Sequence, residues 1–433
     1  MKTRPRRLLA APLAAAACAA TSLLVASPSA AGGHGDDIAD DPAVVERWSV
    51  IATRTIVENG HRPPVSTLYS AFASLAVHDA VAAVEGGFET YADQPRARRG
   101  SSPEAAAATA AYEVLVHYFP ASATALRTDY DNELADVTAG RYGGVRAGRA
   151  AAATIIELRE DDGIDAPVTL PPGDEPGEWV PTTPGMEMYA PWLGGVDPLL
   201  IRDADRFDPG APPDLGSRRY AREFEEVKAY GARTGSVRTP EQTATATFWS
   251  ANAVVQLQRA LGDLAERRDL DIAETARAFA LLDASTADAL IVAWDQKLEH
   301  RFWRPQTAIR EAAEDGNPLT TADATWEPLL PTPPYPDYPS GHATIIGAAT
   351  ETVAEVFGRR HVVLNVPSLV DGVDGRSYSR LDALDREAEN ARIWLGFHFR
   401  TAMEDANDLG HHVADWAAER YLEPTHRGHS GHR

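Results

Sequence analysis

The chain has 433 residues, of which 44% are hydrophobic, so it is long enough for about two or three domain-sized units and is neither disordered nor fibrous. Its formal net charge of −22 at pH 7 disfavours nucleic acid as a partner, because an acidic surface repels phosphates. Any site for an anion must therefore be made positive locally by specific Lys and Arg residues.

The first 31 residues have the three parts of a secretory signal: a basic start, an apolar stretch from Leu8 to Ala26, and a small-residue cleavage site at residues 29–31. The basic residues are Lys2, Arg4, Arg6 and Arg7. We therefore expect a secreted protein, exported by the general or the twin-arginine route, since Arg6-Arg7 matches only part of the twin-arginine pattern. Removing these four cations lowers the formal charge from −22 to −26.

The single cysteine, Cys18, lies within this predicted signal. The mature chain is therefore expected to have no disulfide and no thiolate ligand or nucleophile, although it is predicted to work in an oxidising compartment. After the signal, no stretch reaches the roughly 18 consecutive apolar residues of a membrane helix, so no membrane span is expected.

Apolar residues with helical period predict α-helices in Ala-rich segments at residues 66–84, 103–118, 145–158, 241–264 and 272–303. Strand-like alternation is nearly absent, so the predicted fold class is all-α. Clustered Pro and Gly at residues 161–217 predict a long irregular connection across the surface, between an N-terminal helical half (32–160) and a C-terminal half (218–422). We expect two helical bundles packed in one compact body. The His-rich residues 423–433 are predicted to form a disordered tail.

Lys297 and Arg304 are the first candidate anion ligands. They are seven residues apart, which at about 100° per residue places them on one face of a helix, two turns and roughly 10 Å apart. Pro305 is expected to move Arg304 out of helical geometry and to end the helix there. For this segment alone an ordinary solvated basic face is the favoured interpretation, although the aromatic neighbours fit a partly buried site: Trp294, Phe302 and Trp303.

The second candidate segment follows a Pro-rich stretch, Pro328 to Pro339, and opens a helix predicted over residues 343–357. Ser340 takes the N-cap position, where its hydroxyl and the free amides after it attract anions. Gly341 lets an oxyanion approach the backbone because it has no Cβ, and His342 adds an imidazole. For this segment alone, a plain serine cap followed by a first-turn histidine explains the pattern equally well.

The third segment places Arg392 and His398 in an otherwise apolar run, residues 391–398. A six-residue spacing does not share one helical face, so both side chains reach one point only if the helix ends or bends, which Gly396 permits. A lone His in such a run is more often a hydrogen-bonded core residue. A buried Arg beside it needs a partner, which favours a binding site.

Together these segments supply three cations, a hydroxyl, a bare amide and two imidazoles, the groups that hold an oxyanion and do chemistry on it. Their order, K-x6-R-P, P-S-G-H and R-x5-H, resembles the signature of the vanadium-dependent haloperoxidase and type 2 phosphatidic acid phosphatase superfamily. The likeness is greater to the haloperoxidase branch, in particular to secreted chloroperoxidase-like bacterial proteins, and extends over about residues 45–420. The supporting residues are His78 to Ala80, Arg238 to Pro240, Trp303 to Pro305, Thr307 to Arg310, Pro333 to Pro336 and Leu395 to His398.

The resemblance implies a vanadium chloroperoxidase-like fold and vanadate as the cofactor. It implies that His398 binds the metal covalently and that the vanadate oxygens are held by Lys297, Arg304, Ser340, Gly341 and Arg392. His342 matches the acid–base histidine, and Lys297 would polarise peroxide so that a halide is oxidised to a hypohalous species. The implied partners are hydrogen peroxide, a halide and an organic acceptor if one docks, and the oligomeric state stays open.

A metal-free acid phosphatase is the alternative within the same superfamily. There, His398 would be the nucleophile, forming a phosphohistidine, and His342 would be the general acid. Phosphate and vanadate are so similar that these residues do not separate the two activities, whereas dependence on added vanadate does. A third possibility is an oxyanion-binding protein without turnover.

Two positions depart from the family pattern, in which Ser usually precedes the third-segment Arg and Asp usually follows the third-segment His by four residues. This chain has Ala391 and Ala402 there. The missing carboxylate weakens the expected orientation of His398, because such a partner fixes a ligating imidazole. Glu404 and Asp405 are the nearby candidates to replace it.

Overall fold

The computed structural model describes residues 41–202, 204–359 and 362–425, so the predicted signal at residues 1–31 lies outside the described residues. Within them, the regular structure consists of thirteen α-helices, three short 3-10 helices and one hairpin. The hairpin pairs β1 (Leu364–Val366) with β2 (Arg376–Tyr378) in antiparallel register, with Leu364 opposite Tyr378. The predicted all-α class is confirmed.

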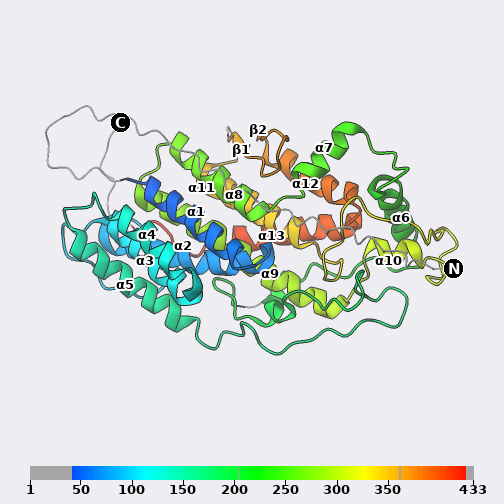
Figure 1. Ribbon diagram of the computed structural model, residues 1–433, viewed down its shortest axis with the longest axis horizontal. Coiled ribbons are helices and arrows are strands. Elements are labelled where there is room, and N and C mark those ends of the chain that lie inside the picture. Colours follow the sequence, from blue (N-terminus) through cyan, green and yellow to red (C-terminus); the bar gives the residue numbers. More distant parts are fainter. Residues whose placement is uncertain (1–40, 203, 360–361, 426–433) are drawn as a thin grey trace, which may run out of the picture. The chain divides into compact units, whose positions relative to one another are not determined.

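The N-terminal helices surround α2, which packs against both α3 and α5 (Figure 1). By length and composition α2 is the one described helix that passes the criteria for a membrane span, but 94% of its apolar window is buried, as in a core helix. The helices are α1 (Ala43–Glu58), α2 (Pro63–Glu85), α3 (Pro103–Tyr118), α4 (Ala123–Glu133) and α5 (Arg141–Leu158), with a 3-10 turn, η1 (Pro120–Ser122), before α4. α3 begins where Pro103 takes the first position and Ser102 accepts a hydrogen bond from the Ala105 amide.

The C-terminal elements are organised around α9, which packs against α2 of the N-terminal half and against α11 and α13 of the C-terminal half. The two groups of helices therefore share one core and form a single compact unit. The helices are α6 (Arg218–Gly231), α7 (Pro240–Phe248), α8 (Ala253–Arg267), α9 (Ile272–His300), α10 (Pro305–Arg310), α11 (Gly341–Phe357), α12 (Leu381–Trp394) and α13 (Arg400–Ala418).

The segment between the two halves is irregular apart from two 3-10 helices, η2 (Pro191–Gly195) and η3 (Ala204–Phe207). It does not stay on the surface as expected. Residues 199–201 are buried, and their three amides donate to the carboxylate of Asp288 on α9 at 2.6, 2.7 and 2.8 Å. A buried carboxylate satisfies these amides, which is why a loop without secondary structure can enter the core here.

The single helix predicted over residues 241–264 is wrong, because the chain breaks between α7 and α8 at residues 249–252. Asn252 starts the new helix by accepting from the amide of Val254 at 3.1 Å, which offers the backbone a cap instead of a continuous helix. The break exposes the carbonyl of Trp249 to other segments of the chain, and the same residue reappears in the candidate site.

The predicted helix 272–303 also ends early, because Arg301 adopts a left-handed conformation (φ 49°) after His300. Arg304 therefore does not share a helix face with Lys297, and the expected spacing of two turns is wrong. The local effect of Pro305 is as expected: Arg304 is extended (φ −81°, ψ 153°), and Pro305 occupies the first turn of α10.

The prediction of a disordered tail over residues 423–433 is wrong for its first three residues. The carbonyl of Glu423 accepts from the Glu89 amide at 2.8 Å, and the amide of Thr425 donates to the Gly87 carbonyl at 2.8 Å. Residues 423–425 are thus paired to the loop after α2, while residues 426–433 lie outside the described part of the chain.

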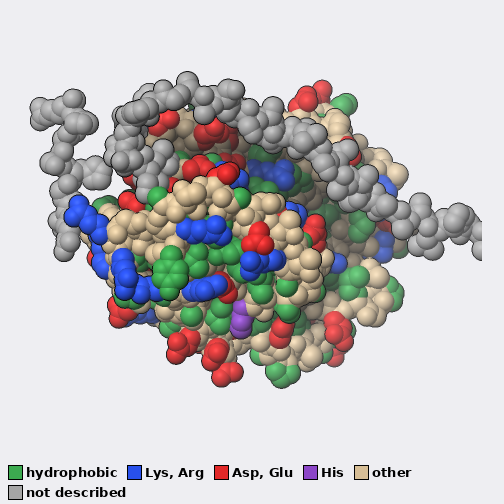
Figure 2. All heavy atoms as spheres, turned by 60° about the vertical axis from the view of Figure 1, so that its left-hand side comes forward, with side chains coloured by type: hydrophobic (Ala, Val, Ile, Leu, Met, Phe, Trp, Pro, Cys, Tyr) green, Lys and Arg blue, Asp and Glu red, His purple; other side chains and the backbone are tan. Residues whose placement is uncertain are grey.

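The charge is unevenly distributed over the surface. Figure 2 shows Lys and Arg side chains gathered across the middle of one face, with Asp and Glu side chains mainly toward its edges. Several exposed arginines of the N-terminal half have no ion pair within the described residues: Arg98, Arg99, Arg141 and Arg146. The net negative charge therefore does not prevent positive regions from forming locally.

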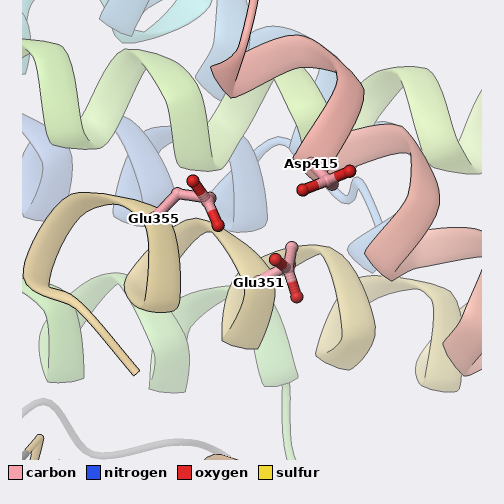
Figure 3. A group of neighbouring side chains, drawn as sticks. All are labelled: Glu351, Glu355 and Asp415. Atoms are coloured by element: carbon pink, nitrogen blue, oxygen red, sulfur yellow. The ribbon is translucent and has the colours of Figure 1, made fainter. Parts of the chain in front are cut away.

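Three carboxylates of α11 and α13 face one another within 4.8 Å: Glu351, Glu355 and Asp415 (Figure 3). Glu351 is 3% exposed and pairs with Arg359, which also lies 3.6 Å from Glu355. His411 Nδ1 lies 2.8 Å from the same Glu351 carboxylate, and its Nε2 lies 3.2 Å from Asp385. Basic side chains thus already balance this acidic cluster, so it gives no ground for a metal site.

The network around His411 predicts a loss of stability at alkaline pH. Burial opposes the charged imidazole, but Asp385 and Glu351 outweigh it and raise the pKa of His411 from 6.5 to about 9. Charged His411 therefore contributes its full stability below pH 6.5, and this contribution, at most about 3 kcal/mol, disappears as the pH rises through 9. Urea denaturation at pH 6.5 and 9.5 measures the free energy of unfolding of wild type and His411→Gln. The difference between the two proteins should be smaller at pH 9.5 than at pH 6.5. His412→Gln, which changes the exposed neighbour, should keep the wild-type pH profile; equal profiles for all three proteins would contradict the assignment.

Candidate oxyanion site

Lys297 is fully buried at 0% exposure, so the interpretation of this segment as a solvated basic face is wrong. Its ammonium donates to three carbonyls of the Pro-rich loop: Pro336 at 2.7 Å, Asp337 at 3.2 Å, and Pro339. Because an ammonium has three N–H groups, all of them are engaged here. Lys297 therefore holds the loop that presents Ser340 and Gly341. To donate to an oxyanion, its ammonium would have to give up one of these carbonyls, and the carbonyl of Asp337 is the most distant of the three.

Arg304 links the Pro-rich loop to the third segment. Its Nε donates to the carbonyl of Tyr335 at 2.7 Å, and its Nη1 donates to the carbonyl of Phe397 at 2.9 Å. The same Nη1 lies 3.0 Å from Nε2 of His398. The remaining nitrogen, Nη2, is buried without a hydrogen-bond partner. A fully buried guanidinium with one free donor is well suited to an anion.

Ser340 occupies the predicted N-cap of α11, with its Oγ accepting from the Ala343 amide at 3.4 Å. The Ser340 amide donates to the carbonyl of Ala402 at 2.9 Å, which joins the start of α11 to the first turn of α13. At Gly341, an added Cβ would lie 2.7 Å from the indole of Trp294. Glycine is thus required by packing against α9, in addition to the approach of an anion that the sequence suggests.

His342 and Arg392 meet at the break between α7 and α8. Arg392 donates from Nη1 to the Trp249 carbonyl at 3.3 Å, and the His342 ring packs edge-on against the Trp249 indole, with centroids 5.9 Å apart. Arg392 Nε and His342 Nε2 are both buried without a partner. Trp249 was not identified from the sequence, because the helix predicted through it conceals the break.

The turn at Gly396 brings His398 back toward Arg392, as the six-residue spacing requires. α12 ends at Trp394, Gly396 has φ +79°, and α13 begins at Arg400. Glu223 on α6 supports the new helix by accepting from the amide of Thr401 at 3.0 Å. The result is a fixed position for His398 just before a helix N-terminus.

Replacing Gly396 with Ala should destabilise the protein. The left-handed backbone costs a non-glycine residue about 1–2 kcal/mol, and the Cβ would also lie 2.8 Å from the Gly231 carbonyl. We expect the free energy of unfolding to fall by about 2–4 kcal/mol, measured by urea denaturation. Gly372→Ala is the control, because φ is similar (+73°) and no atom lies within 4 Å of its added Cβ. Equal losses of unfolding free energy in the two variants would show that the contact with the Gly231 carbonyl has no effect on stability.

The side chain of Asp337 is the site residue that the sequence analysis missed. It is 0% exposed, and its Oδ1 lies 2.9 Å from Nδ1 of His398 and 4.0 Å from Nη1 of Arg304. The candidates expected to replace the missing carboxylate do not reach His398: Glu404 lies near Arg219 at 4.0 Å, and Asp405 accepts from the Tyr338 hydroxyl at 2.8 Å. Asp near prolines is typical of a turn, so its sequence position did not indicate a functional role.

The buried cations shape the electrostatics of the site. Burial lowers the pKa of His398 well below its ordinary value, and nearby Arg304, Lys297, Arg392 and His342 lower it further. Burial also lowers the pKa of Arg392 to about 10 and that of Lys297 well below its ordinary value. For Asp337, burial raises the pKa to about 7, although Arg304 and Lys297 oppose the shift. The lowered pKa values have one common cause, the burial of several cationic side chains together, and a nearby anion would stabilise their charged forms.

The pocket fits an oxyanion, judged by its unpartnered donors. Arg304 Nη2, Arg392 Nε and His342 Nε2 are buried and lack hydrogen bonds within the described structure. Buried polar groups are rarely left without partners, so three of them around one imidazole indicate a missing ligand with several acceptor oxygens. Vanadate and phosphate both match this donor set. The structure brings all seven predicted site residues together: Lys297, Arg304, Ser340, Gly341, His342, Arg392 and His398.

Comparison with known proteins agrees with this arrangement. Residues 277–427 match the family model described as the VCPO second helical-bundle domain. A vanadium chloroperoxidase from Curvularia inaequalis is 28% identical over 229 residues, which cover 46% of this chain and 38% of that enzyme. The match thus spans well under half of the fungal relative.

Two solved bacterial structures share the fold. A vanadium-dependent iodoperoxidase superposes with a TM-score of 0.76 at 23% identity, covering 91% of this chain and all of that one. A vanadium-dependent chloroperoxidase in its holo form superposes with a TM-score of 0.69 at 20% identity, covering 82% and 91%. The signature residues thus lie in the part of the chain that matches the VCPO second helical-bundle domain, and the fold of the chain is that of the bacterial vanadium-dependent haloperoxidases.

Proposed function

We propose that the protein is a secreted vanadate-dependent haloperoxidase that oxidises a halide with hydrogen peroxide to a hypohalous species. The observation that carries this proposal is a set of unpartnered polar atoms near the buried imidazole of His398: the donors Arg304 Nη2 and Arg392 Nε, and the ring nitrogen His342 Nε2. The names of its relatives, chloroperoxidase and iodoperoxidase, support the halide chemistry.

Each residue has a task that follows from its position. His398 would attach the metal through Nε2, since its Nδ1 faces Asp337. Arg304 and Arg392 would donate to the vanadate oxygens, and the Ser340 hydroxyl and Gly341 amide would complete the shell at the start of α11. When bound, vanadate would supply the Lewis-acidic centre that activates peroxide toward the halide. His342 is neutral because burial and Arg392 lower its pKa, so its free Nε2 can accept a proton from peroxide or water.

The test is a paired assay on mature protein purified without phosphate. Bromination of a dione reporter with peroxide and bromide is measured with and without orthovanadate, beside hydrolysis of an aryl phosphate. Vanadate-dependent bromination supports the proposal. Hydrolysis that vanadate inhibits, without bromination, would instead assign the phosphohistidine chemistry of the phosphatase branch to the same residues.

Export is part of the proposal and rests on the signal-like residues 1–31. Expression of the full chain in a bacterial host should yield active protein outside the cytoplasm, with an N-terminus near Gly32 by sequencing. Retention of the complete N-terminus on cytoplasmic protein would contradict this part of the proposal and leave the chemistry untouched.

A further inference from the structure

His398 lacks the carboxylate that the family pattern places four residues later on α13. Ala402 occupies that position, and it is 1% exposed and packed in a hydrophobic cluster with Tyr338 and Phe399. A ligating imidazole ordinarily donates its second N–H to a carboxylate or carbonyl, which fixes both its tautomer and its orientation. Without such a partner, either ring nitrogen of His398 could carry the proton.

Asp337 reaches His398 from a different element. Its Oδ1 lies 2.9 Å from Nδ1 of His398, whereas Nη1 of Arg304 lies nearer to Nε2, at 3.0 Å, than to Nδ1, at 3.4 Å. The contact is close in distance but lacks the regular geometry of a hydrogen bond. Hydrogen bonds in active sites are often poorly aligned until the ligand binds, so the distance and burial are the informative quantities.

The backbone of Asp337 is fixed independently of His398. Its amide donates to the Phe302 carbonyl at 2.9 Å, and its carbonyl accepts from Lys297. The loop then continues to Ser340, whose amide donates to Ala402 at 2.9 Å. The loop that carries Asp337 is therefore hydrogen-bonded to the backbone of residue 402, the position where the family pattern has its carboxylate.

We propose that Asp337 is the positioning residue of His398, and that this chain has moved the carboxylate from the first turn of α13 to the Pro-rich loop. Asp337 accepts the Nδ1 proton, which leaves Nε2 of His398 bare and aimed at the oxyanion beside Arg304. The inference rests on the proposed function for the identity of the oxyanion, but the geometry concerns the protein alone.

The experiment tests whether a carboxylate at residue 402 can replace that of Asp337. Four variants are compared with wild type: Asp337→Ala, Asp337→Asn, the double variant Asp337→Ala/Ala402→Asp, and Glu404→Gln as a control on an exposed carboxylate nearby. The first measurement is 15N NMR of histidine-labelled protein without vanadate, with the His398 signal assigned by its loss in His398→Gln. The second is the dissociation constant of orthovanadate, and separately of phosphate, by calorimetry.

Wild type and Glu404→Gln should show the tautomer protonated at Nδ1. Asp337→Ala should lose this preference and bind orthovanadate about 10- to 100-fold more weakly, and the double variant should recover both. If Asp337→Ala does not fold, Asp337→Asn takes its place in the comparison, because asparagine keeps the side-chain volume. A smaller loss of orthovanadate affinity is then expected. An unchanged tautomer and affinity in Asp337→Asn and Asp337→Ala, or a double variant no better than the single one, would overturn the proposal. If the variants show these changes in tautomer and affinity but the wild type does not brominate the reporter, only the proposed function is overturned.

Discussion

His398→Ala should abolish vanadate-dependent turnover, by at least about a thousandfold, and should weaken orthovanadate binding far more than any other single change in the site. Its imidazole is the proposed metal ligand, and it lies 3.0 Å from Arg304 and 2.9 Å from Asp337. Alanine would remove the proposed metal–nitrogen bond and leave the Asp337 carboxylate without the imidazole between it and Arg304. Calorimetric titration with orthovanadate, followed by the bromination assay, checks both effects.

His342→Ala is the matched comparison, because it removes a second imidazole, whose Nε2 is buried, from the same site while leaving His398 in place. His342 Nε2 has no partner and the ring packs against Trp249, so the substitution removes the proposed proton acceptor. We expect orthovanadate binding to persist within about tenfold and turnover to fall about 100- to 10,000-fold. Should His398→Ala keep full activity, or should both variants lose binding equally, the division of labour between the two histidines would be wrong.

The site could be predicted largely because its local signals are strong. Ser340 caps α11, Pro305 extends Arg304, and Gly396 turns the chain between Arg392 and His398, each through backbone chemistry that one or two residues dictate. Such signals survive in a single sequence because they act within a few residues of where they are read.

The features that were missed are contacts between distant parts of the chain. Asp337 meets His398 across 61 residues of sequence, and the carbonyl of Trp249 meets Arg392 across 143. Neither partner is special locally: Asp337 lies in a Pro-rich loop, and Trp249 lies within an apolar helical pattern. The early end of α9 at Arg301 is also nonlocal, since the carbonyl of Arg301 accepts from the Trp179 amide at 2.6 Å in the distant connection.

Lys297→Met should both destabilise the protein and weaken oxyanion binding. The variant keeps the apolar stem but leaves the carbonyls of Pro336, Asp337 and Pro339 without their donor in a fully buried site. A buried acceptor left unpaired costs about 1–3 kcal/mol, and the charge of Asp337 loses a neighbouring cation. Burying the ammonium is itself costly, as its lowered pKa indicates, and the variant no longer has this cost. The free energy of unfolding should therefore fall by about 3–5 kcal/mol, which is less than the summed cost of three unpaired carbonyls and a lost cation.

The composition of the chain offers a clean control for this prediction. The sequence has three lysines, Lys2, Lys228 and Lys297, and the first lies in the predicted signal. Lys228 also donates to a backbone carbonyl, that of Thr321 at 2.5 Å, but at the surface. Lys228→Met should therefore change stability by about 0.5 kcal/mol or less, and amine-reactive labelling of the folded protein should modify Lys228 and spare Lys297. If Lys297→Met were as stable as Lys228→Met while losing oxyanion affinity, Lys297 would act on the ligand alone, and the Pro-rich loop would be held in place by Arg304.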